Sequence, residues 1–567
     1  MASFIRLPEQ LDRNQFRIRL FFWVFGLGVA LIQVWSYRYY MTADAISYLD
    51  MSDGVMPRQP WTKLITGVWS PFYPFLVGAG RRLLRPSPLS EVVVTHYFNI
   101  GFFIFAFLCF EFLMRSLLED RSEQGTQLLP TWACLVIGYT LFLWASITQI
   151  TLQTVRADML MSGFAYLALG LLLRMRNKEP NWTIYAGLGV VIGLGYLTKA
   201  AMLPFGFLVL AASLFTVTNW RRAVPPAIFA GLLALAIGAA YFYPLSHLRG
   251  HFTLGESSDF NYLYHVDRAG PTWYIQDLGA GTGKLERVPR KIWDNPPTYE
   301  FSFPLPVTHP LRFDPAYWTK GAHPRFRLRS QYAAVRENLH ILAPILGSSG
   351  GVVVAFFVLL FIAARPANFL RLWPLWLLGL AGIAMYDLVH VESRYVGVFF
   401  VLLWLGLICA LRPEADAGGK IVAGLVVGIA LSLFVPMVED ISYDFSKALR
   451  QKSDVNLQAA AELRRLGMCE GDRVARISPV VTDLIWARAS RATVVAEVDY
   501  DLTYRFWQQS ADVRAQVLHA MASSGAKIVV AHVPGELVAP PGWQQLGNTP
   551  QYFQPLVENP FACKPAS

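Results

Sequence analysis

Long apolar runs alternate with short polar connections along most of the chain. A helix that crosses a membrane needs about 20 mostly apolar residues. Eleven segments meet this criterion, and the long run 182–218 is divided at Thr198–Lys199. They lie at 17–38, 92–117, 129–149, 157–174, 182–197, 200–218, 223–245, 342–364, 372–389, 395–411 and 420–437. The pattern therefore predicts a multi-pass α-helical membrane protein with about eleven spans.

Two larger polar segments remain, the loop 246–341 and the tail 438–567. The loop is rich in proline and aromatic residues, which favours a small subdomain. In the tail, helical patterns alternate with strands at Arg473–Ile477, Thr493–Val498 and Ala526–Ala531. Such alternation predicts a small α/β domain with a parallel sheet. We thus divide the chain into membrane modules 1–245 and 342–437, the loop 246–341 and the domain 438–567.

Composition and charge support the membrane assignment and give it an orientation. Of the 567 residues, 54% are hydrophobic and only 16% are charged, which argues against an ordinary soluble enzyme. The net charge is +10, and basic residues gather at alternate connections, for example Arg174, Arg176 and Lys178. The positive-inside rule places these connections in the cytoplasm. We therefore expect a cytoplasmic N-terminus and an extracytoplasmic C-terminal domain.

The first outer loop, 39–91, contains an apolar segment that is too short to cross. Trp69–Gly80 is followed by Arg81, Arg82 and Arg85. If this segment crossed the membrane, every later basic cluster would face outward, against the positive-inside rule. We interpret it as an interfacial helix.

Three carboxylates follow the first span, at Asp44, Asp50 and Asp53. A carboxylate at the membrane interface is costly unless it has a partner or a task. Asp44 lies nearest the membrane and shares a helical face with Tyr48, so a functional role is favoured there. For Asp50 and Asp53, an ordinary solvated loop explains the pattern at least as well. Asp158, at the outer end of the fourth span, fits either a functional acid or a helix N-terminal charge.

Three cations in short outer connections, Arg156, Lys199 and Arg394, break the positive-inside pattern, and a functional role is favoured less for Arg156 than for the other two. Lys199 follows Tyr196-Leu-Thr, and Arg394 lies in His390-Val-Glu392-Ser-Arg394-Tyr395. Their position indicates an anionic partner such as a lipid phosphate. The alternatives are that they extend to lipid headgroups or pair with Asp158 and Glu392.

Two of the five cysteines, Cys469 and Cys563, lie in the tail on the expected outer side. Disulfides persist in such oxidising compartments. A disulfide between them would tie the end of the chain to the first strand region of the tail.

The order of these motifs resembles the multi-pass GT-C glycosyltransferases, in particular bacterial relatives of protein O-mannosyltransferases and the lipid A aminoarabinose transferase. The residues that carry the resemblance are Asp44-Ala-Ile-Ser-Tyr48-Leu-Asp50, Trp69-Ser-Pro-Phe-Tyr73-Pro74, Asp158, Tyr196-Leu-Thr-Lys199 and Glu392-Ser-Arg394-Tyr395. The resemblance covers roughly the first 240 residues best. It implies a location in the bacterial inner membrane.

The resemblance also implies an inverting transfer of a sugar from a polyprenyl-phosphate donor to an extracytoplasmic glycan, lipid or protein hydroxyl. Asp44 would be the general base. Lys199 and Arg394 would stabilise the departing phosphate, with Glu392 and Tyr395 beside them. Asp158 would orient the acceptor or the donor sugar, and Tyr48 would hydrogen-bond Asp44. Trp69 and Tyr73 would cover the site and contact the polyprenyl chain.

Other readings of the sequence stay open. Some GT-C relatives use a divalent cation, and Asp44 and Asp158 could bind one, although no spacing compels it. A transporter or flippase would need ionisable residues near the bilayer midplane and paired broken helices, which the pattern lacks. A non-catalytic cell-envelope scaffold would use the loop aromatics, such as Trp293 and Trp318, as a binding surface. No feature indicates a nucleic-acid partner.

Overall fold

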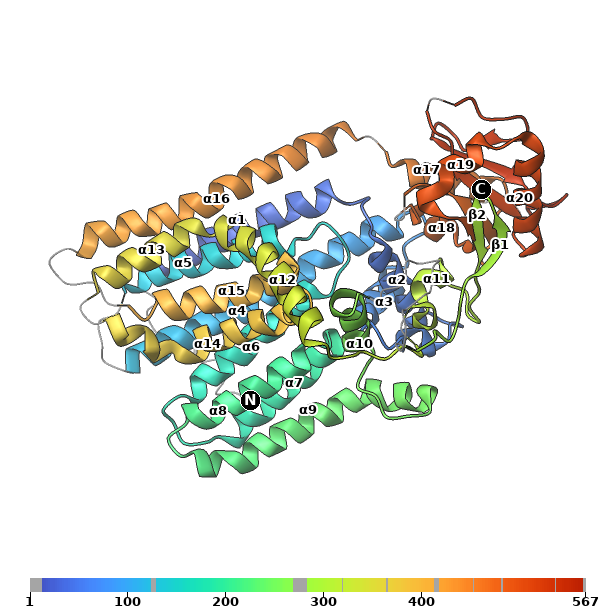
Figure 1. Ribbon diagram of the computed structural model, residues 1–567. Coiled ribbons are helices and arrows are strands. Elements are labelled where there is room, and N and C mark those ends of the chain that lie inside the picture. Colours follow the sequence, from blue (N-terminus) through green and yellow to red (C-terminus); the bar gives the residue numbers. More distant parts are fainter. Residues whose placement is uncertain are drawn as a thin grey trace.

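The chain folds into a long helical bundle that carries an α/β domain at one end (Figure 1). The computed structural model describes residues 13–123, 129–268, 283–318, 320–363, 366–411, 418–451, 453–480, 483–535 and 537–563. The short helices of the first outer loop and of the loop 246–341 lie between the bundle and the domain (Figure 1).

The bundle consists of the long apolar helices. They are α1 (Arg13–Ser36), α4 (Glu91–Glu123), α5 (Thr131–Trp144), α6 (Asp158–Met175), α7 (Trp182–Thr198), α8 (Met202–Thr216), α9 (Trp220–Arg249), α12 (Leu328–Ser348), α13 (Gly350–Phe361), α14 (Trp373–Asp387), α15 (Ser393–Ile408) and α16 (Gly418–Arg450). Among the described residues, seven helices are long and apolar enough to cross a membrane, or eight if one bent pair forms a single span. Three more are apolar but shorter, namely α7, α8 and α15.

Each apolar segment predicted from the sequence contains helix, but one prediction needs correction. The range 342–364 is not one straight helix, because α12 and α13 meet at an angle of 74° between Ser348 and Gly350. Three glycines within five residues, Gly347, Gly350 and Gly351, weaken the helix at this point. The helix before the bend starts at Leu328, inside the segment that we assigned to the outer loop.

Glycines let the central helices approach closely. A Cβ atom on Gly163 of α6 would lie 2.6 Å from the ring of Phe105, and one on Gly170 would lie 2.5 Å from the ring of Phe112. Both phenylalanines belong to α4. Small residues at such positions let two membrane helices pack backbone to backbone. The contact fixes α6, and therefore Asp158 at its first turn, against the helix that begins at Glu91.

The first outer loop forms two helices joined by 3-10 turns. They are α2 (Ala43–Ser52), η2 (Asp53–Val55), η3 (Trp61–Leu64) and α3 (Phe72–Leu84). The side chain of Thr42 caps α2 by accepting a hydrogen bond from Ala45 N at 3.3 Å. The segment predicted to be an interfacial helix forms α3, which begins at Phe72, so Trp69 precedes the helix. Pro71 is the N-cap of α3, so the helix starts after Ser70–Pro71.

The domain at the end of the bundle is built on a seven-stranded sheet of order β1-β2-β4-β3-β5-β7-β6. Its strands are β1 (Arg290–Asp294), β2 (Pro297–Glu300), β3 (Arg473–Ile477), β4 (Thr493–Val498), β5 (Ile528–His532), β6 (Gln544–Gln545) and β7 (Gln551–Pro555). Its helices are α17 (Val455–Arg465), α18 (Ile485–Ser490), α19 (Thr503–Gln508) and α20 (Ala511–Ser523). The central strands β4, β3 and β5 run parallel, as the alternating pattern predicts.

The loop 246–341 contributes to this sheet. Its hairpin β1–β2 pairs antiparallel with β4, with Thr298 opposite Val498. The loop also contains α10 (Ser257–Asn261), the π-helix η5 (Tyr262–Val266), α11 (Pro310–Phe313) and η6 (Pro315–Tyr317). Cys469 and Cys563 form a disulfide with a Cα–Cα distance of 5.5 Å, which ties the end of the chain to the segment before β3.

Candidate functional site

Asp158, Lys199 and Arg394 come from three separate segments and meet at the end of the bundle that carries the α/β domain. Asp158 is the first residue of α6, Lys199 lies between α7 and α8, and Arg394 is the second residue of α15. Lys199 Nζ donates a hydrogen bond to Asp158 Oδ1, and Arg394 Nη1 lies 3.5 Å from Asp158 Oδ2. The side chain of Asp158 is only 4% exposed. The sequence placed all three at one membrane surface, and the fold brings them into contact.

Arg394 has a second carboxylate partner and an aromatic neighbour. Its Nε and Nη2 atoms bind the two oxygens of Glu392 at 2.6 and 2.9 Å. Its Nη2 atom also donates to the hydroxyl of Tyr395 at 2.9 Å. Lys199 Nζ lies 3.8 Å from the centre of the Tyr395 ring, within range of a cation–π interaction. Both pairings that the sequence left open, with Asp158 and with Glu392, are therefore present.

A third cation extends the positive charge of this cluster. The charge of Arg156, two residues before Asp158, acts on both Asp158 and Tyr48. Its Nε atom is buried without a hydrogen-bond partner among the described residues. Three cations thus stand around two paired carboxylates, Asp158 and Glu392. The three cations can therefore meet an anion if it displaces one of these carboxylates.

Asp44 stands beside this cluster with an unengaged carboxylate. It lies in the first turn of α2 and is half-buried. Within the described ranges, its carboxylate makes no hydrogen bond and no ion pair. Its charge acts on Tyr48 and Tyr395, the same tyrosines that respond to Asp158 and Arg394. Asp44 is therefore within electrostatic range of Tyr395 in the cation cluster, and no described side chain pairs with its oxygens.

An aromatic wall lies behind Asp44. The Tyr48 ring lies 5.2 Å from Tyr73 and 6.1 Å from Trp69, and Trp69 packs on Trp318 at 5.4 Å. Burial, together with the nearby charges of Asp158 and Asp44, raises the pKa of the Tyr48 hydroxyl, so Tyr48 stays neutral. Tyr73 is fully buried. It cannot touch a polyprenyl chain in this conformation, and it instead supports Tyr48.

Two histidines complete the surroundings of the cluster, and the sequence analysis had not selected them. The rings of His265 and His390 stack with their centres 3.5 Å apart, and His390 Nε2 lies 3.5 Å from Glu392 Oε1. Burial and the neighbouring His390 lower the pKa of His265 to about 4. His390 lies four positions before Arg394, so its place in the motif was a usable signal. No pattern in the sequence indicated His265.

The donor set does not suit a divalent cation shared by Asp44 and Asp158. One Asp158 oxygen binds Lys199 and the other faces Arg394. A metal ion there would meet two positive side chains at contact distance, and Ca²⁺ or Mg²⁺ needs several free oxygen ligands. Over the ranges that the structure describes, no group of three or more His, Cys, Asp or Glu side chains could hold a metal ion. We derive no step through a metal.

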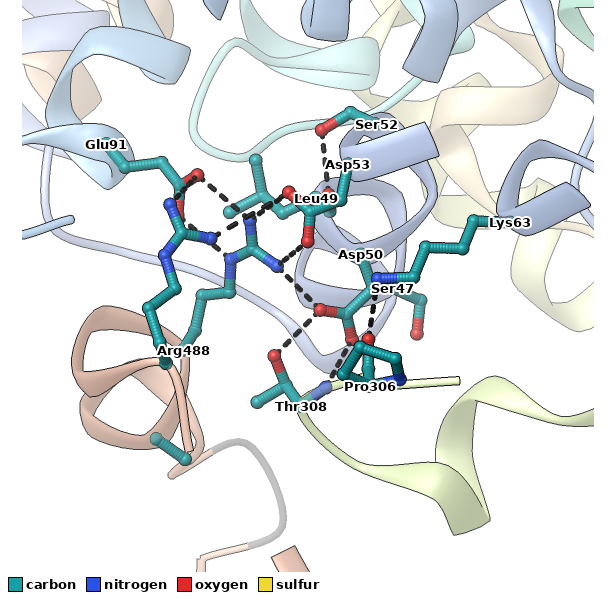
Figure 2. Close-up of polar contacts among 12 residues, drawn as sticks. Ser47, Leu49, Asp50, Ser52, Asp53, Lys63, Glu91, Pro306, Thr308 and Arg488 are labelled. Atoms are coloured by element: carbon teal, nitrogen blue, oxygen red, sulfur yellow. Dashed lines mark hydrogen bonds and ion pairs between the residues drawn. The ribbon is translucent and has the colours of Figure 1, made fainter. Parts of the chain in front are cut away.

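At the C-terminal end of α2, Asp50, Asp53 and Glu91 form a buried ion cluster with Arg488 (Figure 2). Arg488 of α18 binds Asp50 Oδ1 at 2.7 Å, both oxygens of Asp53 at 2.7 Å, and both oxygens of Glu91 at 2.9 Å. Arg81 of α3 also pairs with Asp53, at 3.0 Å, and with Glu91. Asp50 and Asp53 are therefore not solvated loop residues, which corrects one of the two explanations weighed from the sequence.

The loop 246–341 joins the same cluster. Thr308 donates to both oxygens of Asp50, from its backbone N at 3.0 Å and its hydroxyl at 2.8 Å. Lys63 donates to the carbonyl oxygen of Pro306 at 2.6 Å (Figure 2). Burial raises the pKa of Asp50, whereas for Asp53 the cost of burial is outweighed by Arg488 and Arg81, which hold its pKa far below the usual value.

A small cavity of about 140 Å³ lies near the aromatic wall. Thr62, Ile65 and Thr66 of the first outer loop line it, together with Arg249 and polar residues of the loop 246–341 such as Asp314. Arg249 Nη2 donates to the carbonyl oxygen of Thr66 at 2.9 Å, three residues before Trp69. The cavity offers hydroxyls and charges to a polar ligand.

Comparison with known proteins finds similarity in structure only. No family model and no curated protein sequence matches the chain. ArnT from Cupriavidus metallidurans in the apo state aligns over 95% of this chain and 99% of its own, with 13% identity and a TM-score of 0.41. Its structure bound to undecaprenyl phosphate aligns over 96% of this chain and 99% of its own, with 11% identity and a TM-score of 0.43.

An oligosaccharyltransferase from Archaeoglobus fulgidus, in complex with Zn and sulfate, is also similar. It aligns over 91% of this chain and 68% of its own, with 12% identity and a TM-score of 0.47. At these scores the likeness gives no correspondence between individual residues.

Proposed function

We propose that the chain is a membrane glycosyltransferase of the GT-C type that takes a sugar from a polyprenyl-phosphate donor. The observation that carries the proposal is the juxtaposition at the N-terminal end of α2. Asp44, whose carboxylate has no partner among the described residues, lies within electrostatic range of a cluster in which Lys199 and Arg394 converge from different segments. A base next to a phosphate-sized positive site is what a phosphate-displacing transfer requires.

The geometry supports an inverting displacement. An acceptor hydroxyl gives its proton to an oxygen of Asp44, and the hydroxyl oxygen bonds to the anomeric carbon. The bond from that carbon to the phosphate oxygen breaks, and the electron pair leaves with the polyprenyl phosphate. Lys199 and Arg394 turn from Asp158 and Glu392 toward the new negative charge, and the carboxylates hold them in place between turnovers.

The surrounding residues bind and orient the substrates. Tyr48, held neutral, can donate a hydrogen bond to Asp44, and Asp158 positions the two cations. Trp69 and Tyr395 present aromatic faces at the site. The small cavity beside Thr62 and Thr66 is the proposed space for part of the acceptor. Lipid-linked donors reach an extracytoplasmic site, so we place this end of the bundle and the α/β domain outside the bacterial inner membrane, with the N-terminus in the cytoplasm.

The test is sugar release from radiolabelled polyprenyl-phosphate donors in the presence of a cell-envelope extract. We expect transfer by the purified wild type, transfer by the exposed-site control Asp512→Asn, and loss of at least about 100-fold in Asp44→Asn, which cannot accept a proton. Asp44→Asn should keep its thermal unfolding midpoint. Full activity in that variant contradicts the role of Asp44 as base. Inactive wild type that still binds donors means that the extract lacks the acceptor, whereas a folded wild type that neither transfers sugar nor responds to polyprenyl phosphate favours a transporter or a scaffold.

A further inference from the structure

We propose that Arg488 of the α/β domain is a positioning residue for Asp44. It docks the domain on the C-terminal end of α2 and thereby sets where the N-terminal end of that helix holds its carboxylate. The inference rests on the proposed function, in which Asp44 is the base. It makes the outer domain a working part of the transfer site.

Arg488 is fully committed to this contact. An arginine side chain has five N–H donors. In Arg488, Nε donates to Glu91, Nη1 donates to Asp50 and Asp53, and Nη2 donates to Asp53 and Glu91. The five hydrogen bonds are all between 2.7 and 2.9 Å. Every donor is used, and each one goes to a carboxylate.

The contact joins elements that lie far apart in the sequence. Asp50 belongs to α2, Asp53 begins the turn after it, and Glu91 is the first residue of the membrane helix α4 (Figure 2). The side chain of Arg488 is 3% exposed and that of Glu91 is fully buried. Water is therefore excluded from the contact while the domain is docked, and removing one partner in place would leave a buried charge uncompensated.

A second tether runs parallel to the first. Thr308 binds Asp50 with its N–H and hydroxyl groups, and its carbonyl oxygen accepts a hydrogen bond from Val494 N of β4 at 2.9 Å. The sheet thus reaches α2 through Thr308 while α18 reaches it through Arg488. These contacts hold Asp50 and Asp53, three positions apart, and thereby restrain both the direction and the position of the helix.

A single rigid element connects this anchor to the base. Asp44 and Asp50 are both in α2, a helix of 10 residues capped by Thr42. At 1.5 Å per residue the two side chains are separated by about 9 Å along the helix axis. A tilt at the anchored end therefore moves Asp44 relative to Lys199 and Arg394, which belong to other helices. Displacements of about 1 Å at a reacting group can lower a rate by about 100-fold.

Lysine cannot reproduce this anchor, although it keeps the charge. An ammonium group offers three donors from one nitrogen and does not match two carboxylates bidentately. The Arg488→Lys variant therefore keeps the cluster neutralised while loosening its geometry. Thr308→Val cuts a single hydrogen bond to Asp50 and leaves no charge unpaired. Arg465→Lys, at an exposed arginine of the same domain, serves as the matched control.

The experiment combines hydrogen exchange with steady-state kinetics on the full-length protein. In Arg488→Lys we expect faster amide exchange across residues 43–52, a kcat at least 10-fold lower, and a donor KM within about 2-fold of the wild type, because the cation cluster is untouched. Thr308→Val should show the same signature at about 2- to 5-fold. Arg465→Lys should show no change in either measurement.

Other outcomes overturn the inference. Unchanged exchange in 43–52 for both variants means that the cluster does not hold α2. Faster exchange with an unchanged kcat means that the position of α2 does not matter for transfer. A fall of kcat and a rise of KM together, with exchange raised throughout the chain, indicates general unfolding. If the wild type transfers no sugar, the proposed function fails on its own, and exchange confined to the N-terminal turn of α2 still decides whether Arg488 positions Asp44.

Discussion

The two ends of α2 carry the same kind of side chain in opposite states. At the N-terminal end, Asp44 is half-buried and its carboxylate has no ionic partner in the described part of the chain. At the C-terminal end, Asp50 and Asp53 are buried and saturated by Arg488, Thr308 and other donors. A buried charge is tolerated when an opposite charge pairs with it. A general base, in contrast, needs a carboxylate that is not already held in an ion pair.

Within this single helix, the carboxylates at the C-terminal end are held in ion pairs and the carboxylate at the N-terminal end is not. Seven residues of α2 are buried, so the helix cannot move without disturbing its neighbours. In the proposed function, the saturated end holds the helix and the unsaturated end presents a base to the cation cluster. Substitutions at the two ends should therefore have opposite profiles, one in stability and one in activity.

The largest stability effect is expected at the saturated end. Asp53→Asn leaves Arg488 and Arg81 short of a carboxylate in a dry environment, and breaking a buried ion pair costs about 3–5 kcal/mol. Thermal unfolding in detergent should show a clear drop in the midpoint. Asp44→Asn should shift stability by no more than about 0.5 kcal/mol, as is usual away from buried networks. Equal shifts in the two variants would abolish the distinction between the ends.

Lys199→Gln tests the cation cluster opposite the unsaturated end. The variant keeps a donor but loses the charge, and hydrogen bonds to charged groups are worth about 1.5–3 kcal/mol. We expect the donor KM to rise by about 10- to 100-fold, measured with a polyprenyl-phosphate sugar. Arg222→Gln, at an exposed arginine of α9, should leave KM unchanged. An unaltered KM in Lys199→Gln would mean that the cluster serves only to balance Asp158.

Gly78→Ala should disturb only the C-terminal end of α2, where the carboxylates are paired. A Cβ atom on Gly78 of α3 would lie 2.6 Å from the carbonyl oxygen of Ser52, at the end of α2. Overpacking of this kind costs about 1–3 kcal/mol. The unfolding midpoint should fall, and amide exchange should rise at residues 50–55 more than at 43–46. Gly101→Ala, where nothing lies within 4 Å, is the control.

The smallest effect is expected from pH. Burial lowers the pKa of His309, whose Nε2 lies 3.1 Å from Glu497 Oε2 between the outer loop and β4. Because the folded pKa lies below the unfolded value of about 6.5, His309 stabilises the fold above pH 6.5 and this stability is lost as the pH falls. The unfolding midpoint of the wild type should decrease below pH 6.5, and His309→Gln should flatten that part of the profile. An identical pH profile in the variant would assign the acid sensitivity to another group, such as His265, whose pKa is also lowered by burial.

The sequence predicted the helices, the parallel strands and most residues of the cluster of charges near Asp44. Hydropathy identifies membrane helices because lipid leaves the backbone no alternative. Lys199 and Arg394 stood out because cations are rare in outer connections. Arg488 gave no such signal, since one arginine in a soluble helix is ordinary. Its partners lie some 400 residues away, and only the tertiary fold shows that they are buried together.

The pairing of Thr298 with Val498 has a consequence for synthesis of the protein. About 200 residues separate the two strands, and a ribosome adds roughly 5–20 residues per second. The hairpin β1–β2 therefore waits about 10–40 seconds for the strand that receives it, with an edge of unpaired amides exposed. During that interval the membrane helices α12 to α16 are inserted. Assembly of the outer sheet becomes the last step, and it can proceed only after the final span has been threaded in the correct direction.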